Sequence, residues 1–226
     1  MVLYRVDAFA YHGAMTAFTD PVETEVKFHL TDPAAMRTRL TALGARSLGR
    51  CHERNIRFED EGRNLIRRKC LLRLRRDRKT TLTVKLPPAD ADPAFKQFVE
   101  LEAEVADFDG MQRILAALGY HPEQKYEKWR ETFVLERTTF CLDALPFGDF
   151  LEIEGPKDAI RDVAGRLELD WRKRIVLNYL EIFDRLRTRH DLPFRDVTFD
   201  NFAASAVQTA AVLPLLEADP PQPPEG

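Results

Sequence analysis

The feature that most constrains the fold is an alternation of charged and uncharged residues in several short segments. In the segment ETEVKF, Glu23, Glu25 and Lys27 occupy every second position. Successive side chains of a β-strand point to opposite faces, so this spacing puts the three charges on one face of a strand. Alone, the segment is most typical of a half-buried strand whose charged face meets water.

The same alternation recurs in most of the predicted strands. Acidic rows and basic rows lie on different segments of the chain, as though each row had a partner. The basic rows are Arg73 with Arg75, Lys85 with Thr81 and Thr83 at alternate positions before it, and Lys128 with Arg130. The acidic rows are Glu100 with Glu102 and Glu104, Asp143 with Cys141 two positions before it, and Glu152 with Glu154.

Two architectures fit these two-faced strands. In an open sheet, helices cover the apolar face and the charged face is wet. In a closed barrel, the apolar faces point outward under helices and the charged faces line the bore. A row of carboxylates repels itself unless cations face it, and rows of arginine and lysine attract anions. The whole set therefore shifts the balance toward the barrel, with the open sheet as the alternative.

Turn signals and periodicity divide the body of the chain into strands and short helices. A strand with the pattern E-x-E leads into a short helix three times, which indicates a repeated unit within one sheet system. Strands are predicted at 22–30, 51–60, 70–77, 80–87, 95–108, 124–136, 139–145 and 148–155, and helices at 32–45, 109–120, 156–169 and 174–190.

Length and composition indicate one globular domain. The chain has 226 residues, of which 44% are hydrophobic, and a net charge of −3. That is enough apolar material for a core, and the charge does not call for a nucleic-acid or membrane partner. We place the domain at residues 21–190, after an N-terminal extension at 1–20. Residues 191–226 form a C-terminal extension whose proline-rich, acidic end we expect to be disordered.

The cysteines and the N-terminus indicate a cytoplasmic protein. Cys51, Cys70 and Cys141 are odd in number and widely spaced, which is typical of reduced thiols. Arg5 and Asp7 interrupt the apolar run that an export signal needs. No stretch approaches the ~20 apolar residues of a transmembrane helix.

Carboxylates beside arginine and lysine have an obvious joint ligand, a metal-bound polyphosphate. Mg²⁺ and Mn²⁺ take oxygen ligands from a few carboxylates, phosphate and water. Arginine and lysine can hold the remaining phosphate oxygens. The basic segment RRKCLLRLRRDRK lacks the interleaved aromatic residues of a nucleic-acid binder.

In this order the motifs resemble the CYTH family, also called triphosphate tunnel metalloenzymes. The motif Glu23-x-Glu25-x-Lys27 is followed by LLRLRR, LTVKLP, VELEAEV, YEKWRETF, CLDALPFGDFLEIEG and LNYLEIF, so the resemblance covers residues 21 to 188. NIRFEDEGRNLIRRKCLLRLRR and GDFLEIEGPKDAI are most similar to the class IV adenylyl cyclase branch. One departure is Phe58, where many members have tyrosine, and it puts any role of that ring hydroxyl in doubt.

The resemblance implies an α+β fold with an eight-stranded antiparallel β-barrel, open as a tunnel, and helices outside. It implies Mg²⁺ or Mn²⁺ held by Glu23, Glu25 and Glu154, with Asp143 and Glu152 close by, and catalytic roles for Glu25 and Lys27. Glu102 and Glu104 would be secondary acids of the tunnel. The triphosphate would be held by Lys27, Arg73, Arg75, Lys85, Lys128 and Arg130.

Two reactions suit such a site. An adenylyl cyclase converts ATP to cyclic AMP and pyrophosphate, and we place it narrowly first. A triphosphatase hydrolyses tripolyphosphate, thiamine triphosphate or a nucleoside triphosphate. A non-catalytic binder of polyphosphate or nucleotide is the third hypothesis. All three have a small triphosphate as partner, with no nucleic acid and no membrane, and leave a homodimer open.

Overall fold

The computed structural model describes residues 22–203, 205 and 216 of the chain. The predicted N-terminal extension and the proline-rich end therefore lie outside the described residues. Within them, eight strands form one closed antiparallel barrel in the order β1-β5-β4-β3-β2-β6-β7-β8. The strands are β1 (Val22–Leu30), β2 (Arg46–Asp60), β3 (Leu71–Arg76), β4 (Thr80–Leu86), β5 (Lys96–Glu104), β6 (Tyr120–Leu135), β7 (Thr138–Leu145) and β8 (Gly148–Glu154).

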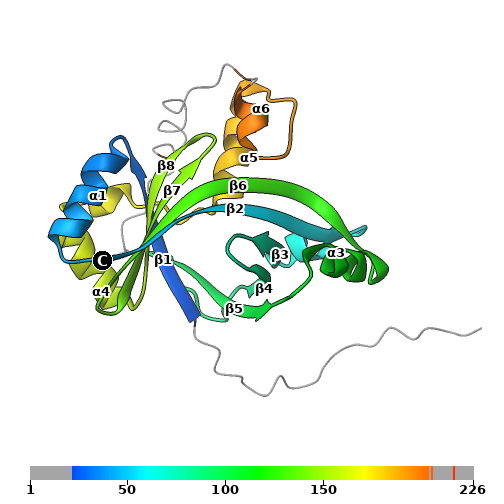
Figure 1. Cartoon of the computed structure of the whole chain (residues 1–226), viewed down its shortest axis with the longest axis horizontal. Coiled ribbons are helices and arrows are strands. Elements are labelled where there is room, and N and C mark those ends of the chain that lie inside the picture. Colours follow the sequence, from blue (N-terminus) through cyan, green and yellow to red (C-terminus); the bar gives the residue numbers. More distant parts are fainter. Residues whose placement is uncertain (1–21, 204, 206–215, 217–226) are drawn as a thin grey trace, which may run out of the picture.

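The two longest strands, β2 and β6, pair along most of their length and arch over β3, β4 and β5 (Figure 1). The described part of the chain also has six α-helices and one 3₁₀ turn, η1 (Trp171–Lys173). The helices are α1 (Pro33–Ala42), α2 (Asn64–Arg67), α3 (Phe108–Ala117), α4 (Lys157–Arg166), α5 (Tyr179–His190) and α6 (Phe199–Ala203). The sequence did not predict α2, α6 and η1.

Each strand with the E-x-E pattern leads into a helix, as β1 into α1, β5 into α3 and β8 into α4. Two of these helices begin at an aspartate side chain. Asp32 accepts a hydrogen bond from Ala35 N at 2.9 Å, and Asp107 accepts one from Gly110 N at 2.9 Å. Such caps satisfy backbone N–H groups that lack a partner within the helix. The repeat in the sequence is therefore a repeat in the structure.

The last predicted helix starts five residues later than expected. Asn178 and Glu181 form a capping box, which fixes the first turn of α5 at Tyr179. Before it, Ile175 is extended and exchanges two backbone hydrogen bonds with Lys27, at 3.0 and 2.7 Å. Residues 174–178 are therefore not helical because Ile175 pairs with β1.

The apolar strand faces point outward under helices, which confirms the barrel and makes the open sheet wrong. On one side, Val26, Phe140 and Ile153 are fully buried beneath α1 and α4. On another side, the outer faces of β2, β3 and β4 pack against α3, and Phe58 lies there at 1% exposure. Because Phe58 faces this core, the ring at that position does not reach the bore.

The C-terminal part of the described chain pairs with two strand segments that have a barrel neighbour on one side only. Ile175 pairs with β1, and Val197 forms a parallel bridge with Tyr126 of β6. A second cluster of aromatic side chains, which includes Phe147, Phe150 and Phe183, holds α5 and α6 against the barrel. In Figure 1 these two helices lie above β6 and beside the hairpin of β7 and β8. This packing brings Tyr179, at the first turn of α5, next to the charged interior.

Candidate active site

The barrel interior is lined by buried charges. Glu25, Lys27 and Asp143 are each no more than 2% exposed. A buried charge is costly unless it is paired, so the partners of these groups define the site. The structure brings nearly all of the predicted site residues to this interior; Glu102 is partly open to solvent at its rim, and Glu104 lies outside it at the exposed edge. Those inside are Glu23, Glu25, Lys27, Arg73, Arg75, Lys85, Glu102, Lys128, Arg130, Asp143, Glu152 and Glu154.

Three carboxylates converge where β1 meets β8. Oxygen atoms of Glu23, Glu25 and Glu154 lie within 4.8 Å of one another. Strand alternation places Glu23 and Glu25 on the same face, and Glu154 is the register partner of Glu25 across the β1–β8 pair. Hereafter we call these three residues the acidic triad.

The members of the acidic triad differ in their partners. Glu25 bonds to Lys27 and, at 2.5 Å, to Lys96. Burial acts to raise the pKa of Glu25, but the lysines outweigh it and lower the pKa to about 2. Glu154 has no ion-pair partner among the described residues, and burial together with the charge of Glu152 raises its pKa well above the ordinary value.

Glu23 shares a lysine with a carboxylate of β5. Lys85 lies 2.5 Å from Glu23 and 2.8 Å from Glu100. The two carboxyl groups are also hydrogen-bonded to each other, and burial with this bond raises the pKa of Glu23 to about 7. Glu23 can therefore carry a proton near neutral pH, which a cation bound at the triad would displace.

A second group of charges surrounds Asp143 of β7. Arg130 approaches it through two nitrogen atoms, at 2.7 and 2.6 Å, and Lys128 donates at 2.9 Å. The hydroxyl of Tyr179 donates a further hydrogen bond at 2.8 Å. Asp143 is thus fully engaged by donors and lies outside the acidic triad.

Glu152 connects the two groups. It accepts from Lys27 at 2.9 Å and from Arg130 at 2.8 Å. Although burial acts to raise it, the neighbouring cations hold the pKa of Glu152 well below the ordinary value. Glu152 is therefore a fixed negative charge that orders Lys27 and Arg130 beside the triad.

The cations of β3 face carboxylates of β5 across β4. Arg73 lies 3.4 Å from Glu100, and Arg75 lies 3.1 Å from Glu102. Glu104 is different, because its side chain is 65% exposed and reaches Lys79 at 3.4 Å. Glu102, with a side chain that is 37% exposed, joins the network at its rim through Arg75, while Glu104 lies at the open edge.

Sequence reasoning missed three residues of this interior. Lys96 bonds to Glu25, and Glu53 lies 3.5 Å from Lys128. Lys96 lies on the same face of β5 as Glu100 and Glu102, so counting back along that strand would have found it, whereas no residue of β2 was among the predicted site residues. Tyr179 sits on a helix, and no local pattern shows that its ring lies 5.2 Å from the Lys27 ammonium.

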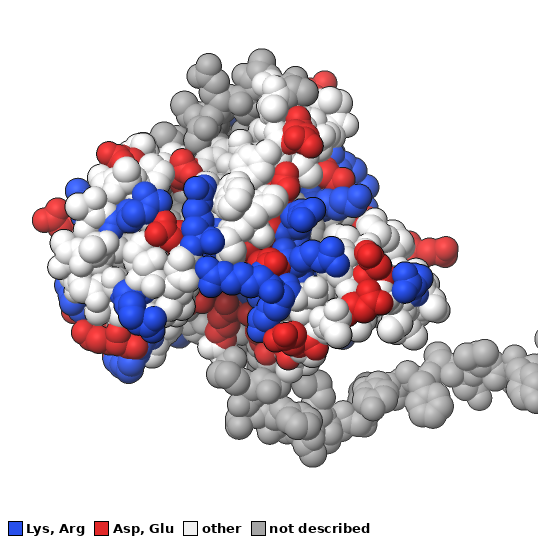
Figure 2. All heavy atoms as spheres, in the orientation of Figure 1, with Lys and Arg blue, Asp and Glu red and all other residues white. Residues whose placement is uncertain are grey.

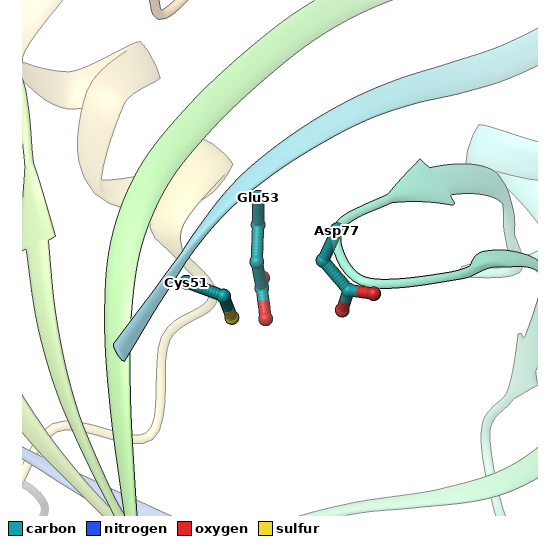
Figure 3. Close-up of side chains that lie close together, drawn as sticks. All are labelled: Cys51, Glu53 and Asp77. Carbon is teal, nitrogen blue, oxygen red and sulfur yellow. The ribbon is translucent and has the colours of Figure 1, made fainter. Parts of the chain in front are cut away.

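Two cysteines also lie near carboxylates, Cys51 beside Glu53 and Asp77, and Cys141 beside Glu152 and Glu154. Figure 3 shows Cys51 and Glu53 of β2 beside Asp77 of the β3–β4 turn, with ligand atoms within 4.8 Å of one another. Arg130 lies 3.8 Å from Glu53 and Arg75 lies 3.5 Å from Asp77, so these acids already have counter-charges. All three cysteines of the chain are free thiols in the structure.

The acidic triad fits a divalent metal. Three carboxylates whose oxygen atoms lie within 4.8 Å of one another suit the preference of Mg²⁺ and Mn²⁺ for oxygen ligands. Glu154 supplies an independent sign, because its carboxyl group faces Glu25 and Glu152 and has no cationic partner among the described residues. The basic residues beside the triad suit phosphate oxygens. Figure 2 shows lysine and arginine gathered below β2 and β6, with acidic atoms among them.

Comparison with known proteins agrees with this arrangement. A family model for the CYTH domain matches residues 22–181. No curated protein sequence matches the chain. None of the helices in the described residues is both long enough and apolar enough to cross a membrane.

Several solved structures share the fold. A protein of Pyrococcus horikoshii OT3 is 29% identical, with 70% of this chain and 98% of that chain covered at a TM-score of 0.61. A Vibrio parahaemolyticus protein, proposed to be an adenylate cyclase, is 21% identical, with 72% and 97% covered at a TM-score of 0.64. A Hippeastrum protein, proposed as an adenylyl cyclase and described with a dominant triphosphatase activity, is 20% identical, with 65% and 84% covered at a TM-score of 0.50.

Proposed function

We propose that this chain, which belongs to the CYTH domain family, is a metal-dependent enzyme that acts on a triphosphate inside its barrel. One observation carries the proposal: the acidic triad, of which Glu25 is buried and Glu23 and Glu154 are partly buried, lies directly beside ordered cations of the same bore. Phosphoryl transfer depends on positioning and charge neutralisation more than on covalent catalysis. Carboxylates that hold a metal beside cations that hold phosphate oxygens would supply both.

The acidic triad would hold Mg²⁺ or Mn²⁺, with Glu152 beside it. A bound metal would polarise phosphate oxygens and favour the attacking oxygen. The chain's own cations would hold the other phosphate oxygens. Lys27 is the nearest of them to the triad, and its pKa is raised by Glu152 and Glu25 despite its burial, so it stays charged. We therefore assign Lys27 and Glu25 to the reacting end of the triphosphate.

We place the cyclisation of ATP first, because two segments resemble the class IV adenylyl cyclase branch. In this reaction the ribose 3′-hydroxyl attacks the α-phosphorus, and the bond to the β-phosphate oxygen breaks, so pyrophosphate leaves. Hydrolysis by water at the terminal phosphorus, with release of orthophosphate, is the second candidate. It is favoured by the chemistry of the bore, whose buried charges recognise phosphate and metal and do not require a nucleoside.

Purified full-length chain incubated with Mg²⁺ or Mn²⁺ tests both reactions. ATP, tripolyphosphate and thiamine triphosphate are supplied separately, and products are resolved by ³¹P NMR and nucleotide chromatography. Cyclic AMP with pyrophosphate identifies the cyclase, and orthophosphate identifies the triphosphatase. Survival of all three substrates, with tight binding, would instead identify a non-catalytic polyphosphate module.

The matched variants are Glu25→Gln in the triad and Glu131→Gln on the outer face of β6, where Glu131 bonds to Arg37 at 2.8 Å. Both remove one carboxylate charge with little change in shape. Turnover should be lost only in Glu25→Gln, while both proteins stay folded by circular dichroism. Equal activity of the two variants would remove Glu25 from the reacting site.

A further inference from the structure

A cavity of about 360 Å³ lies between the β2–β6 pair and α5. None of the triad's residues lines it, and Arg57 lies on the same face of the sheet as Arg73, so the cavity opens on the bore-facing side of β2. Three of its residues follow residue 181, where the family match ends, so family membership does not account for it. Its lining is Arg57, Arg63, Glu123, Gln124, Asp184, Arg187 and Arg195.

Two of the four arginines in this cavity are held by close ion pairs with Glu123. Arg63 lies 2.9 Å from Glu123, and Arg195 bonds to the same carboxylate oxygen. Gln124 donates to the backbone oxygen of Arg195 at 2.7 Å. These contacts hold the segment around residue 195 against β6, and the two arginines neutralise the charge of Glu123.

Arg57 has no ion-pair partner among the described residues, and Arg187 has only a long ion pair with Asp184. The Nε atom of Arg187 is buried without a hydrogen-bond partner among the described residues, and Asp184 is 3.8 Å away. Arg57 is also the register partner of Arg73 on β3, so two guanidinium-bearing residues sit directly opposite each other. Like charges in that position destabilise a sheet unless an anion lies between or beside them.

We propose that this cavity binds a phosphate-type oxyanion, held by Arg57 and Arg187, in addition to the triphosphate of the bore. The forked guanidinium group matches phosphate oxygens and retains its charge at any working pH. The volume falls within the range of ligand pockets and admits a pyrophosphate group. The anion is either a free phosphate or pyrophosphate, or the far end of a longer polyphosphate chain that passes Arg73.

Titration calorimetry of the full chain with pyrophosphate, without metal, tests the site. The variants Arg57→Gln and Arg187→Gln should weaken a pyrophosphate binding event about tenfold or more, the loss of one charge-assisted contact. Arg113→Gln is the matched control, because Arg113 lies on α3 with a side chain that is 74% exposed. The same isotherm in the pocket variants and in the control overturns the proposal.

A measurement on the unaltered chain covers the case in which a variant does not fold. Arginine modification by phenylglyoxal, mapped by mass spectrometry, should slow at Arg57 and Arg187 when pyrophosphate is present, and stay unchanged at Arg113. Equal modification of Arg57 and Arg187 with and without pyrophosphate counts against the site. Both readouts measure binding, so they stand even if the chain turns over no triphosphate.

Chain length separates the two sources of the anion. If the cavity holds the far end of a threaded chain, Arg187→Gln should weaken the binding of long polyphosphate and leave tripolyphosphate unchanged. If it holds a free anion, the variant should weaken orthophosphate or pyrophosphate binding in a chain whose bore is already filled with tripolyphosphate. Equal affinities of variant and unaltered chain for all of these ligands would overturn the site itself.

Discussion

Glu25 and Glu154 are direct partners across the β1–β8 pair, yet only Glu25 has cations bonded to it. Two carboxylates in that position repel each other, and the repulsion grows as water is excluded. The sheet tolerates the pair because Lys27 and Lys96 neutralise Glu25. Glu154 has no such cation, so burial and Glu152 raise its pKa and favour its protonated form, and a bound cation would displace that proton.

Replacing Glu154 with glutamine should therefore separate stability from metal binding. The metal-free protein should become slightly more stable, by about 0.5 kcal/mol, because glutamine removes an acidic group whose ionised form is disfavoured opposite Glu25. Affinity for Mn²⁺ should fall about tenfold or more, since even outer-shell changes cost that much. Thermal melting and Mn²⁺ titration by electron paramagnetic resonance measure the two effects. Unchanged Mn²⁺ affinity would place the metal elsewhere in the bore.

Lys96 should prove as important for turnover as the basic residues found from the sequence. It contacts Glu25, and burial lowers the pKa of its ammonium group, although Glu25 opposes this shift. Lys96→Met should lower kcat/KM for the triphosphate about tenfold or more, the value of one charge-assisted contact. Lys96→Arg should restore part of this loss. Lys157→Met, at a surface lysine paired with Asp92, is the control and should leave the kinetics unchanged.

Much of the barrel could be predicted from the sequence because strand alternation is a local property. The row of Glu23, Glu25 and Lys27 faces inward for the same reason that Val26 faces outward. What failed were contacts between distant segments. The start of α5 was missed because Ile175 pairs with β1 across the fold, and the position of Tyr179 depends on that same contact. Nothing near either residue in the chain carries that information.

The hydroxyl of Tyr179 should stabilise the bore. It donates a hydrogen bond of 2.8 Å to Asp143, a residue that is only 1% exposed. Tyr179→Phe removes this donor and keeps the ring, so the free energy of unfolding should fall by about 1.5 kcal/mol, the lower end for a hydrogen bond to a charge. Urea denaturation measures the loss. Tyr120→Phe is the control, because the Tyr120 hydroxyl has no hydrogen bond to a described residue. An equal effect of both variants would contradict the prediction.

Glu53 should make stability depend on pH in the acid range. Burial acts to raise its pKa, but Lys128 and Arg130 outweigh burial and lower it from 4.5 to about 2 in the folded chain. Between these values the unfolded chain binds the proton more readily, so stability rises with pH. The contribution is complete above the unfolded pKa of 4.5 and is lost as pH falls toward 2. A shift of this size is worth about 3 kcal/mol at neutral pH.

The variant Glu53→Gln isolates this contribution, because glutamine keeps the shape and cannot titrate. The difference in unfolding free energy between the unaltered chain and Glu53→Gln should be about 2 kcal/mol smaller at pH 3 than at pH 6, from the linkage relation. Urea denaturation at several pH values in that range measures it. A difference that stays constant with pH would mean that Lys128 and Arg130 do not hold Glu53 ionised, and that Asp143 and Glu152 alone balance those two cations.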